Sequence, residues 1–258
     1  MNTLSVVIIV YNEEQVIRKC LDSVKEIADE IVVVDSESTD STPTICRDYG
    51  CRVFRRKFDG YGTQKQFGVE QAINDWILSV DADEIVSDEL KKELRVLFNR
   101  GQMPDVSGLP DKQGYRIPFL FSYMGKILNH ARIGKEYHLR LFNRKYGRFN
   151  SNVVHEGIEL NGTTGTLKNA IIHHSYRDLF HQIAKANQYT SQAAEEYVKK
   201  GKSFSGVWVA FKFPVSFFIY YILRGGFLDG YPGFLWSFFA AFYGSVKIAK
   251  TIEKRYKV

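Results

Sequence analysis

Three continuous apolar runs, each stopping abruptly at polar or acidic residues, constrain the fold that this chain can adopt. The runs are LSVVIIV (4–10), IVVV (31–34) and WILSV (76–80). Runs without polar alternation form strands that are buried on both faces of a parallel sheet. Between the first two runs, apolar residues recur at helical spacing, at positions Val16, Ile17, Cys20, Leu21 and Val24. The sequence therefore predicts an α/β protein with a doubly wound, mostly parallel sheet.

The segments between these runs continue the alternation. We expect a helix that is capped within DSESTDST and ends near Tyr49, a strand at 51–54, and a helix around 65–73. Asp81 and Asp83 then leave the third run on the same side, because side chains alternate along an extended chain. A solvated acidic turn that opens the next helix is the simpler interpretation of this DAD sequence taken alone.

All three runs end in residues suited to binding, which favours a site over three separate solvated turns. Tyr11-Asn12-Glu13 follows the first run, Asp35 ends the second, and Asp81-Ala82-Asp83 ends the third. Ligands bind at the carboxyl ends of strands in open α/β sheets. The first run is not followed by G-x-G-x-x-G, and the chain has no Walker loop, so these two nucleotide-binding classes lose support. What remains is a nucleotide held by carboxylates at its ribose and base.

At these positions the chain resembles the family 2 glycosyltransferases, which are inverting enzymes of the GT-A fold. The resemblance lies in VVIIVYNEE, IVVVDSESTDST, GYGTQKQFGVEQA and WILSVDADE, which occur in the family's order within residues 4–90. The later pattern YRIPF…RLF…VHEGIEL is similar to a subgroup that contains lipopolysaccharide inner-core β-glucosyltransferases. The resemblance implies transfer of a sugar, with glucose from UDP-glucose expected, onto a lipopolysaccharide-core or other lipid-linked saccharide. A polyprenyl-phosphate glycosyltransferase of the same fold is the alternative enzyme.

The resemblance also implies roles at the nucleotide end of the donor. Tyr11 and Glu13 would contact the base and ribose, and Asp35 would contact the base edge. Lys65 would reach the nucleotide or its diphosphate. Gln66 stands where the family often has Asn. The alternatives are a helix-start role for Glu13 and a solvated helix charge at Lys65.

For the diphosphate end, the resemblance implies a metal site within the DAD sequence. Asp83 would ligate the metal directly, and Asp81 would face the ribose and a metal-bound water, with Ala82 in the donor site between them. Mg²⁺ and Mn²⁺ prefer oxygen ligands and would offset the charge that builds on the departing diphosphate.

Inversion requires a base that takes the proton of the acceptor hydroxyl, and a carboxylate is the natural choice. Glu156, in the sequence NVVHEG, is the main candidate, and the subgroup resemblance also points to it. Glu159 is the second candidate, and a structural ion pair is the alternative for both.

Other polar residues of the second half have two open interpretations. His173-His174 follows an apolar stretch and would either bring an imidazole to the metal or diphosphate, or form a structural hydrogen-bonding pair. Arg140 and Arg144 would hold the diphosphate or an anionic acceptor, or be solvated charges.

Charge divides the chain into two parts. Residues 1–90 contain 9 Lys and Arg against 18 Asp and Glu, whereas residues 91–258 contain 26 against 11. A loop at 99–114, rich in Gly, Pro and Asp, is expected to separate a nucleotide half (1–98) from an acceptor half (115–200). A basic second half suits an anionic partner, either a nucleic acid or an acidic membrane surface.

The last part of the chain, residues 201–258, differs in composition from the GT-A domain expected over residues 1–200. Residues 204–243 contain 16 of the 37 aromatic residues and only three charged ones, Lys212, Arg224 and Asp229. Two apolar runs, 213–223 and 234–246, are short for a membrane span, and basic residues follow the second. This pattern predicts a helical segment inserted into the surface of an anionic leaflet, with a buried hairpin or a two-span hairpin as alternatives.

Three remaining features bear on the compartment and the partner class. Three cysteines without metal-ligand spacing suggest a reducing compartment. The amino terminus lacks a basic n-region, so we expect no signal peptide and a protein attached to the cytoplasmic face of the inner membrane. A basic nucleic-acid-binding protein is the non-enzyme alternative; we expect no nucleic acid, because the aromatic residues form an apolar block without interleaved Lys or Arg.

Overall fold

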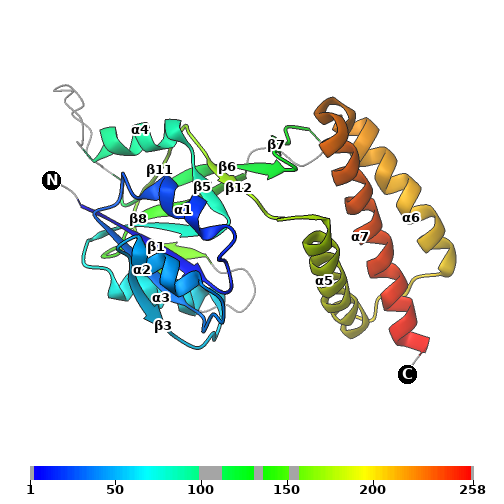
Figure 1. The fold of residues 1–258 in the computed structure, drawn as a ribbon. Helices are drawn as coiled ribbons and strands as arrows, with labels where there is room; N and C mark the ends of the chain where they lie inside the picture. The colour runs from blue at the N-terminus through cyan, green and yellow to red at the C-terminus, as the bar shows by residue number, and fades with distance from the viewer. Residues whose placement is uncertain (1–2, 99–111, 131–135, 151–156, 257–258) are drawn as a thin grey trace. The chain divides into compact units, whose positions relative to one another are not determined.

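A computed structural model describes residues 3–98, 112–130, 136–150 and 157–256 (Figure 1). Its first half alternates strands and helices, as the apolar runs predict. The elements are β1 (Leu4–Val10), α1 (Ile17–Val24), β2 (Glu30–Asp35), α2 (Thr42–Asp48), β3 (Arg52–Arg55), α3 (Tyr61–Gln71) and β4 (Trp76–Asp81). Each of these elements lies within a few residues of its predicted position.

Parallel strands form the part of the sheet that carries the three acidic ends. The strand order there is β3-β2-β1-β4, and all three neighbouring pairs are parallel. In this register Val10 lies opposite Asp35, and Ile9 lies opposite Asp81. The carboxyl ends of β1, β2 and β4 therefore meet at one edge of the sheet, as the sequence predicts.

Beyond β4 the sheet is mixed. Strand β8 (Glu136–Asn143) pairs antiparallel with β4 and with β6 (Gly114–Tyr123), and β12 (Ile171–His173) pairs antiparallel with β5 (Glu84–Val86). The smaller strands are β7 (Lys126–Ile127), β9 (Gly147–Phe149), β10 (Ile158–Leu160) and β11 (Thr164–Thr166). The predicted α/β class is confirmed, with the parallel pairing concentrated in the nucleotide half.

The turn after β4 is not a solvated acidic turn that opens a helix, which is the simpler interpretation of the DAD sequence. The acidic residues do not open a helix; they lead into the short strand β5, and α4 (Asp88–Leu97) begins only after Ser87. The Ser87 hydroxyl accepts the backbone N–H of Leu90, which is the usual N-cap arrangement. This extra strand fixes the acidic turn at both ends.

Close packing between α3 and the sheet depends on Gly68. A Cβ atom at this position would lie 2.5 Å from a Val7 methyl and 3.1 Å from a Val34 methyl. The helix therefore approaches β1 and β2 as closely as a residue without a side chain allows. This approach sets the position of Lys65, which lies one turn earlier on the same helix.

The chain divides into two compact units. One comprises Met1–Leu120 and Lys135–His173, and the other comprises Phe121–Gly134 and His174–Val258. The second contains α5 (Leu179–Lys199), α6 (Gly206–Phe218), the π-helix η1 (Ile219–Leu223), the 3-10 helix η2 (Gly226–Asp229) and α7 (Gly230–Tyr256). The structure thus groups α5 with the C-terminal helices, whereas the sequence analysis places it in the acceptor half and draws a boundary at residue 200.

Candidate functional site

The loops that follow β1 and β2 are joined by hydrogen bonds at the carboxyl edge of the sheet. The backbone N–H of Asn12 donates to the Ser38 hydroxyl (2.9 Å), and the N–H of Thr39 donates to the Asn12 side-chain oxygen (2.8 Å). The N–H of Glu13 donates to the Thr42 hydroxyl (2.8 Å). Asn12 has a positive φ of 54°, a conformation that Asn tolerates better than most residues. The two loops therefore form one preformed wall beside the acidic strand ends.

Two of the predicted base-binding residues differ in their accessibility. Tyr11 is 59% exposed, so its ring is available to a ligand at this edge. Asp35 is only 2% exposed, and its carboxylate accepts the backbone N–H of Ser38 at 3.2 and 3.3 Å. Asp35 thus holds its own loop in shape, and its contact with a base stays a prediction.

Asp81, at the end of β4, lies between two cations. Lys65 Nζ is 2.9 Å from Asp81 Oδ1, and Arg140 Nη2 donates to Asp81 Oδ2 at 3.1 Å. Burial acts to raise the pKa of Asp81, but the charges and hydrogen bonds of Lys65 and Arg140 outweigh it and hold this pKa well below its usual range. Asp81 is therefore a permanent anion, and the buried Lys65 is not a solvated helix charge.

Glu84, which is not among the residues predicted from the sequence, completes this charge cluster. Its side chain is buried; one carboxylate oxygen accepts from Arg140 at 2.8 Å and the other accepts the backbone N–H of Asp81 at 2.8 Å. Burial raises the pKa of Glu84 to about 7 against the opposing charge of Arg140, and the nearby Asp81 adds to the rise. Glu84 thus fixes both Arg140 and the backbone of the DAD turn.

Asp83 faces a histidine from another strand. Strand β12 pairs with β5 so that His173 lies opposite Glu84, and His173 Nε2 is 3.2 Å from Asp83 Oδ2. Burial lowers the pKa of His173, but its hydrogen bond to Asp83 and the charges of Asp83, Glu84 and Asp81 outweigh burial and raise it above the usual value. Of the two histidines proposed from sequence, His173 meets the acidic turn through Asp83.

The fit of these residues to a divalent cation is partial. Asp83 and His173 offer a carboxylate oxygen and an imidazole nitrogen, and both side chains are about one-third exposed, at 28% and 33%. Both oxygens of Asp81 face cations. The described ranges contain no group of three or more His, Cys, Asp and Glu placed to hold a metal. Mg²⁺ is typically held by one or two carboxylates and completes its shell with phosphate oxygens and water, so Asp83 suits such a cation, whereas an imidazole such as that of His173 is a ligand of other divalent metals.

Arg140 and Arg144, which the sequence left undecided, have different roles. Arg140 lies in the charge cluster and stacks on Phe119, with its guanidinium carbon 5.1 Å from the ring centre. Arg144 donates to the backbone oxygens of Val69 and Ala72, where α3 ends, so it stabilises that helix terminus. Arg140 is therefore the functional candidate of the two.

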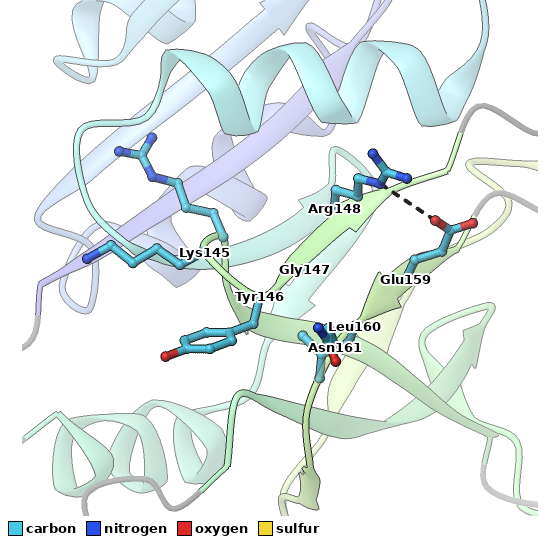
Figure 2. Close-up of a pocket in the computed structure, with 8 residues that line it drawn as sticks. Lys145, Tyr146, Gly147, Arg148, Glu159, Leu160 and Asn161 are labelled. Atoms are coloured by element: carbon cyan, nitrogen blue, oxygen red, sulfur yellow. Dashed lines mark ion pairs between the residues drawn. The ribbon is translucent and has the colours of Figure 1, made fainter.

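The predicted base, Glu156, lies outside the described residues, so its role stays a prediction. Glu159, the second candidate, lies on β10 with its carboxylate 3.6 Å from Arg148 on β9 (Figure 2). This pair borders an open hollow of about 460 Å³ whose lining also includes Lys145, Tyr146 and Asn161. Both members of the pair are more than half exposed, which is typical of a surface ion pair.

The chain is similar to several known proteins. Residues 5–146 match the model of the family described as glycosyl transferase family 2. An uncharacterized glycosyltransferase of Rickettsia typhi is 33% identical over 98% of this chain and 88% of its own length. The lipopolysaccharide core biosynthesis glycosyltransferase LpsC of Rhizobium meliloti is 34% identical over 97% of this chain and 92% of its own length. The solved structure of Staphylococcus aureus TarS 1-349 in complex with UDP-GlcNAc aligns with 99% of this chain and 91% of that one, at 13% identity and a TM-score of 0.46.

Proposed function

This chain belongs to the family 2 glycosyltransferases, and from that premise we propose that it transfers glucose from UDP-glucose to a lipopolysaccharide-core saccharide with inversion at the anomeric carbon. The match to LpsC over nearly the whole of both chains supports the choice of acceptor. The observation that carries the proposal is the preformed edge at which Asp81, Asp83 and His173 meet beside Lys65 and Arg140.

The donor would bind along this edge with its nucleoside toward β1 and β2. Tyr11 offers an exposed ring for the base, and the loops around Asn12 and Ser38 offer polar groups to the ribose. Lys65 and Arg140 are the buried cations next to the DAD turn, and the electrostatic attraction of a diphosphate to them is strong because both are largely desolvated. Asp81 holds both cations in place before the donor arrives.

Asp83 and His173 would hold a divalent cation beside the diphosphate. When bound, that cation offsets the negative charge that develops as the diphosphate leaves. Arg140 adds positive charge from the protein itself, and Glu84 keeps its guanidinium oriented. The acceptor hydroxyl would lose its proton to Glu156 while its oxygen attacks from the face opposite the diphosphate.

The test is a panel of nucleotide sugars measured for binding and transfer, with and without a divalent cation. The acceptors are lipopolysaccharide with a truncated core and a polyprenyl phosphate. We expect metal-dependent transfer from UDP-glucose to the truncated core. Transfer to the polyprenyl phosphate alone would favour the alternative acceptor class, and a panel without any bound nucleotide sugar would refute the proposal.

Two variants separate donor binding from proton transfer. Glu156→Gln should lower kcat by about 10²- to 10⁴-fold and leave donor affinity unchanged, because only the proton acceptor is lost. Glu159→Gln is the matched control, since its carboxylate makes only an exposed ion pair with Arg148, and its turnover should stay near that of the wild type. Normal turnover of Glu156→Gln would contradict the assignment of the base.

A further inference from the structure

An apolar surface runs along one side of the C-terminal helices. Within the described part of the chain, Gly206–Leu223 is the one stretch long and apolar enough to cross a membrane, and only 6% of it is buried. Val207, Phe211, Val215, Phe218 and Ile222 recur every three or four residues along α6 and η1, and each is 44–64% exposed. We call these five residues the outer face. Their spacing places them on one side of a helix.

The opposite side of the same helix already has a partner. Phe213 meets Phe238 on α7 at 5.3 Å between ring centres, and Phe217 meets Phe234 at 5.7 Å. Small residues of α7, including Ser237 and Ala241, are also buried. The hairpin formed by α6 and α7 therefore has its own core, and the residues of the outer face do not contribute to the ring contacts that form it. This arrangement argues against the buried hairpin considered from sequence.

The tip of the hairpin is fixed to polar backbone. Asp229, at the end of η2, is 1% exposed, and its carboxylate accepts the backbone N–H groups of Asn129 (3.2 Å) and His130 (2.9 Å). The His130 ring nitrogen Nδ1 lies 3.0 Å from the same carboxylate, and Lys126 Nζ donates to the Asp229 backbone oxygen at 2.9 Å. The tip is thus joined to a segment whose polar residues Lys126, Asn129 and His130 would disfavour entry into hydrocarbon.

The other end of the hairpin is fixed to α5. Lys247 donates to the Tyr197 hydroxyl (3.0 Å), and Lys254 donates to Glu195 (2.8 Å). Lys250 donates to oxygens of Asn187, Thr190 and Ser191 at 2.7–2.9 Å. A hairpin held at both ends by polar elements cannot cross a bilayer without breaking one set of these contacts.

We propose that the hairpin lies in the plane of an anionic phospholipid bilayer, with the outer face immersed in one leaflet. At 1.5 Å per residue, the 13 residues of α6 present about 20 Å of apolar helix to the lipid, and η1 extends it. Residues 201–258 contain eight Lys and Arg against two acidic residues, of which Asp229 is internal. This charge complements an anionic leaflet rather than a second basic copy of the chain. The proposal stands apart from the proposed function, since it depends on none of the donor-site residues.

The first test is co-flotation of the full chain with phosphatidylcholine vesicles and with vesicles that also contain phosphatidylglycerol. We expect partitioning into the anionic vesicles to be stronger by about tenfold or more and to weaken with added salt. Phe211→Glu combined with Phe218→Glu should reduce it by about 100-fold, because two aromatic anchors become charges. Phe180→Glu is the matched control: Phe180 is 83% exposed but lies on α5, and its variant should bind within about threefold of wild type.

Two outcomes would overturn the proposal. One is wild-type protein that stays with the soluble fraction for both vesicle types. The other is a soluble dimer that the double variant converts to monomers, because the outer face would then belong to a second copy. Circular dichroism of each variant shows that a lost interaction does not reflect unfolding.

The second test measures depth with brominated lipids. Trp208 lies on α6 and is 59% exposed, whereas Trp76 is buried in the sheet unit and Trp236 packs against Phe121 and Tyr123, so the quenching that is lost in Trp208→Phe comes from Trp208. Val215→Trp, made in the Trp208→Phe background, places a second reporter two turns along the helix. An in-plane helix should show both reporters quenched best by the same shallow bromine position. Deep quenching at position 215 with shallow quenching at Trp208 would indicate a spanning hairpin and refute the proposal.

Discussion

Replacing Arg140 with Met tests whether its positive charge stabilises the carboxylates of Asp81 and Glu84 in the folded protein. The substitution leaves Asp81 paired with Lys65 and leaves the buried Glu84 without its guanidinium partner, with the imidazole of His173 as another positive group nearby. Removing one partner of a buried ion pair costs about 3–5 kcal/mol, because the other charge stays desolvated. Arg140 is 14% exposed and Asp81 28%, so we take the lower limit, about 3 kcal/mol. For a chain of this size, that predicts a fall in Tm of roughly 6–12 °C.

The loss of stability in Arg140→Met should depend on pH, because it depends on the ionisation of Glu84. Its pKa in the folded protein is about 7, above the value of 4.5 expected for an exposed carboxyl group. A raised pKa in an acid contributes stability that is full below the unfolded pKa and is lost as the pH rises through the folded pKa. Without Arg140, which lowers this pKa, Glu84 stays neutral to a higher pH. The deficit of Arg140→Met should therefore be smaller near pH 6 than near pH 8.5.

The assay is urea unfolding at both pH values, followed by tryptophan fluorescence in the Trp208→Phe background, where Trp76, packed edge-on against Phe98 within the sheet unit, and Trp236 remain. Arg148→Met is the control, since its ion pair with Glu159 is exposed, and its cost should be below about 1 kcal/mol. Adding Glu84→Gln to Arg140→Met should recover part of the loss. A deficit equal to that of Arg148→Met, or one that does not change with pH, would refute this account of the cluster.

Two further predictions concern packing. Gly68→Ala should destabilise the protein by about 1–3 kcal/mol in urea unfolding, because its new methyl would overlap Val7, whereas Gly206→Ala meets no atom within 4 Å and should be neutral or stabilising. Burial raises the pKa of the Cys46 thiol to about 12 and that of Cys51 to about 11, so neither should react with a thiol reagent near pH 8 until the protein unfolds. Fast labelling of either thiol in the folded protein would contradict the described core.

The parallel part of the fold could be predicted because its strands are buried on both faces. A continuous apolar run such as Leu4–Val10 has few alternatives, and the structure forms β1 over the same residues. The meeting of the three acidic ends then follows, since the carboxyl ends of neighbouring parallel strands share one edge. The family resemblance is confirmed by the family match and by relatives over nearly the whole chain.

The charge pairing within the site could not be predicted in the same way. His173 reaches Asp83 only because β5 and β12 form an antiparallel pair of three residues each, in which His173 lies opposite Glu84, 89 positions earlier in the sequence. Such short strands carry too few residues for a periodic signal. Two adjacent histidines in a sequence also do not indicate which imidazole points toward the acidic turn, because successive side chains of a strand point to opposite faces of the sheet.

The mixed sheet and the grouping of α5 have a related cause. Both depend on contacts between segments distant in sequence, such as β4 with β8 and α5 with α7. By composition, α5 resembles the acceptor half, because the aromatic-rich stretch 204–243 begins only after this helix ends. In the structure, polar side chains of α5 accept hydrogen bonds from lysines of α7. Composition alone does not indicate these contacts.

The helical unit is assembled from two separate pieces of chain, and this has a consequence for protein engineering. Residues Phe121–Gly134 belong to it, and Phe121, Tyr123 and Leu128 pack with Leu235 and Trp236. A protein shortened after residue 200 would leave that apolar cluster without its covering helix. The C-terminal helices are therefore not a detachable tail, and a chimera that exchanges them between relatives would have to exchange the 121–134 segment as well.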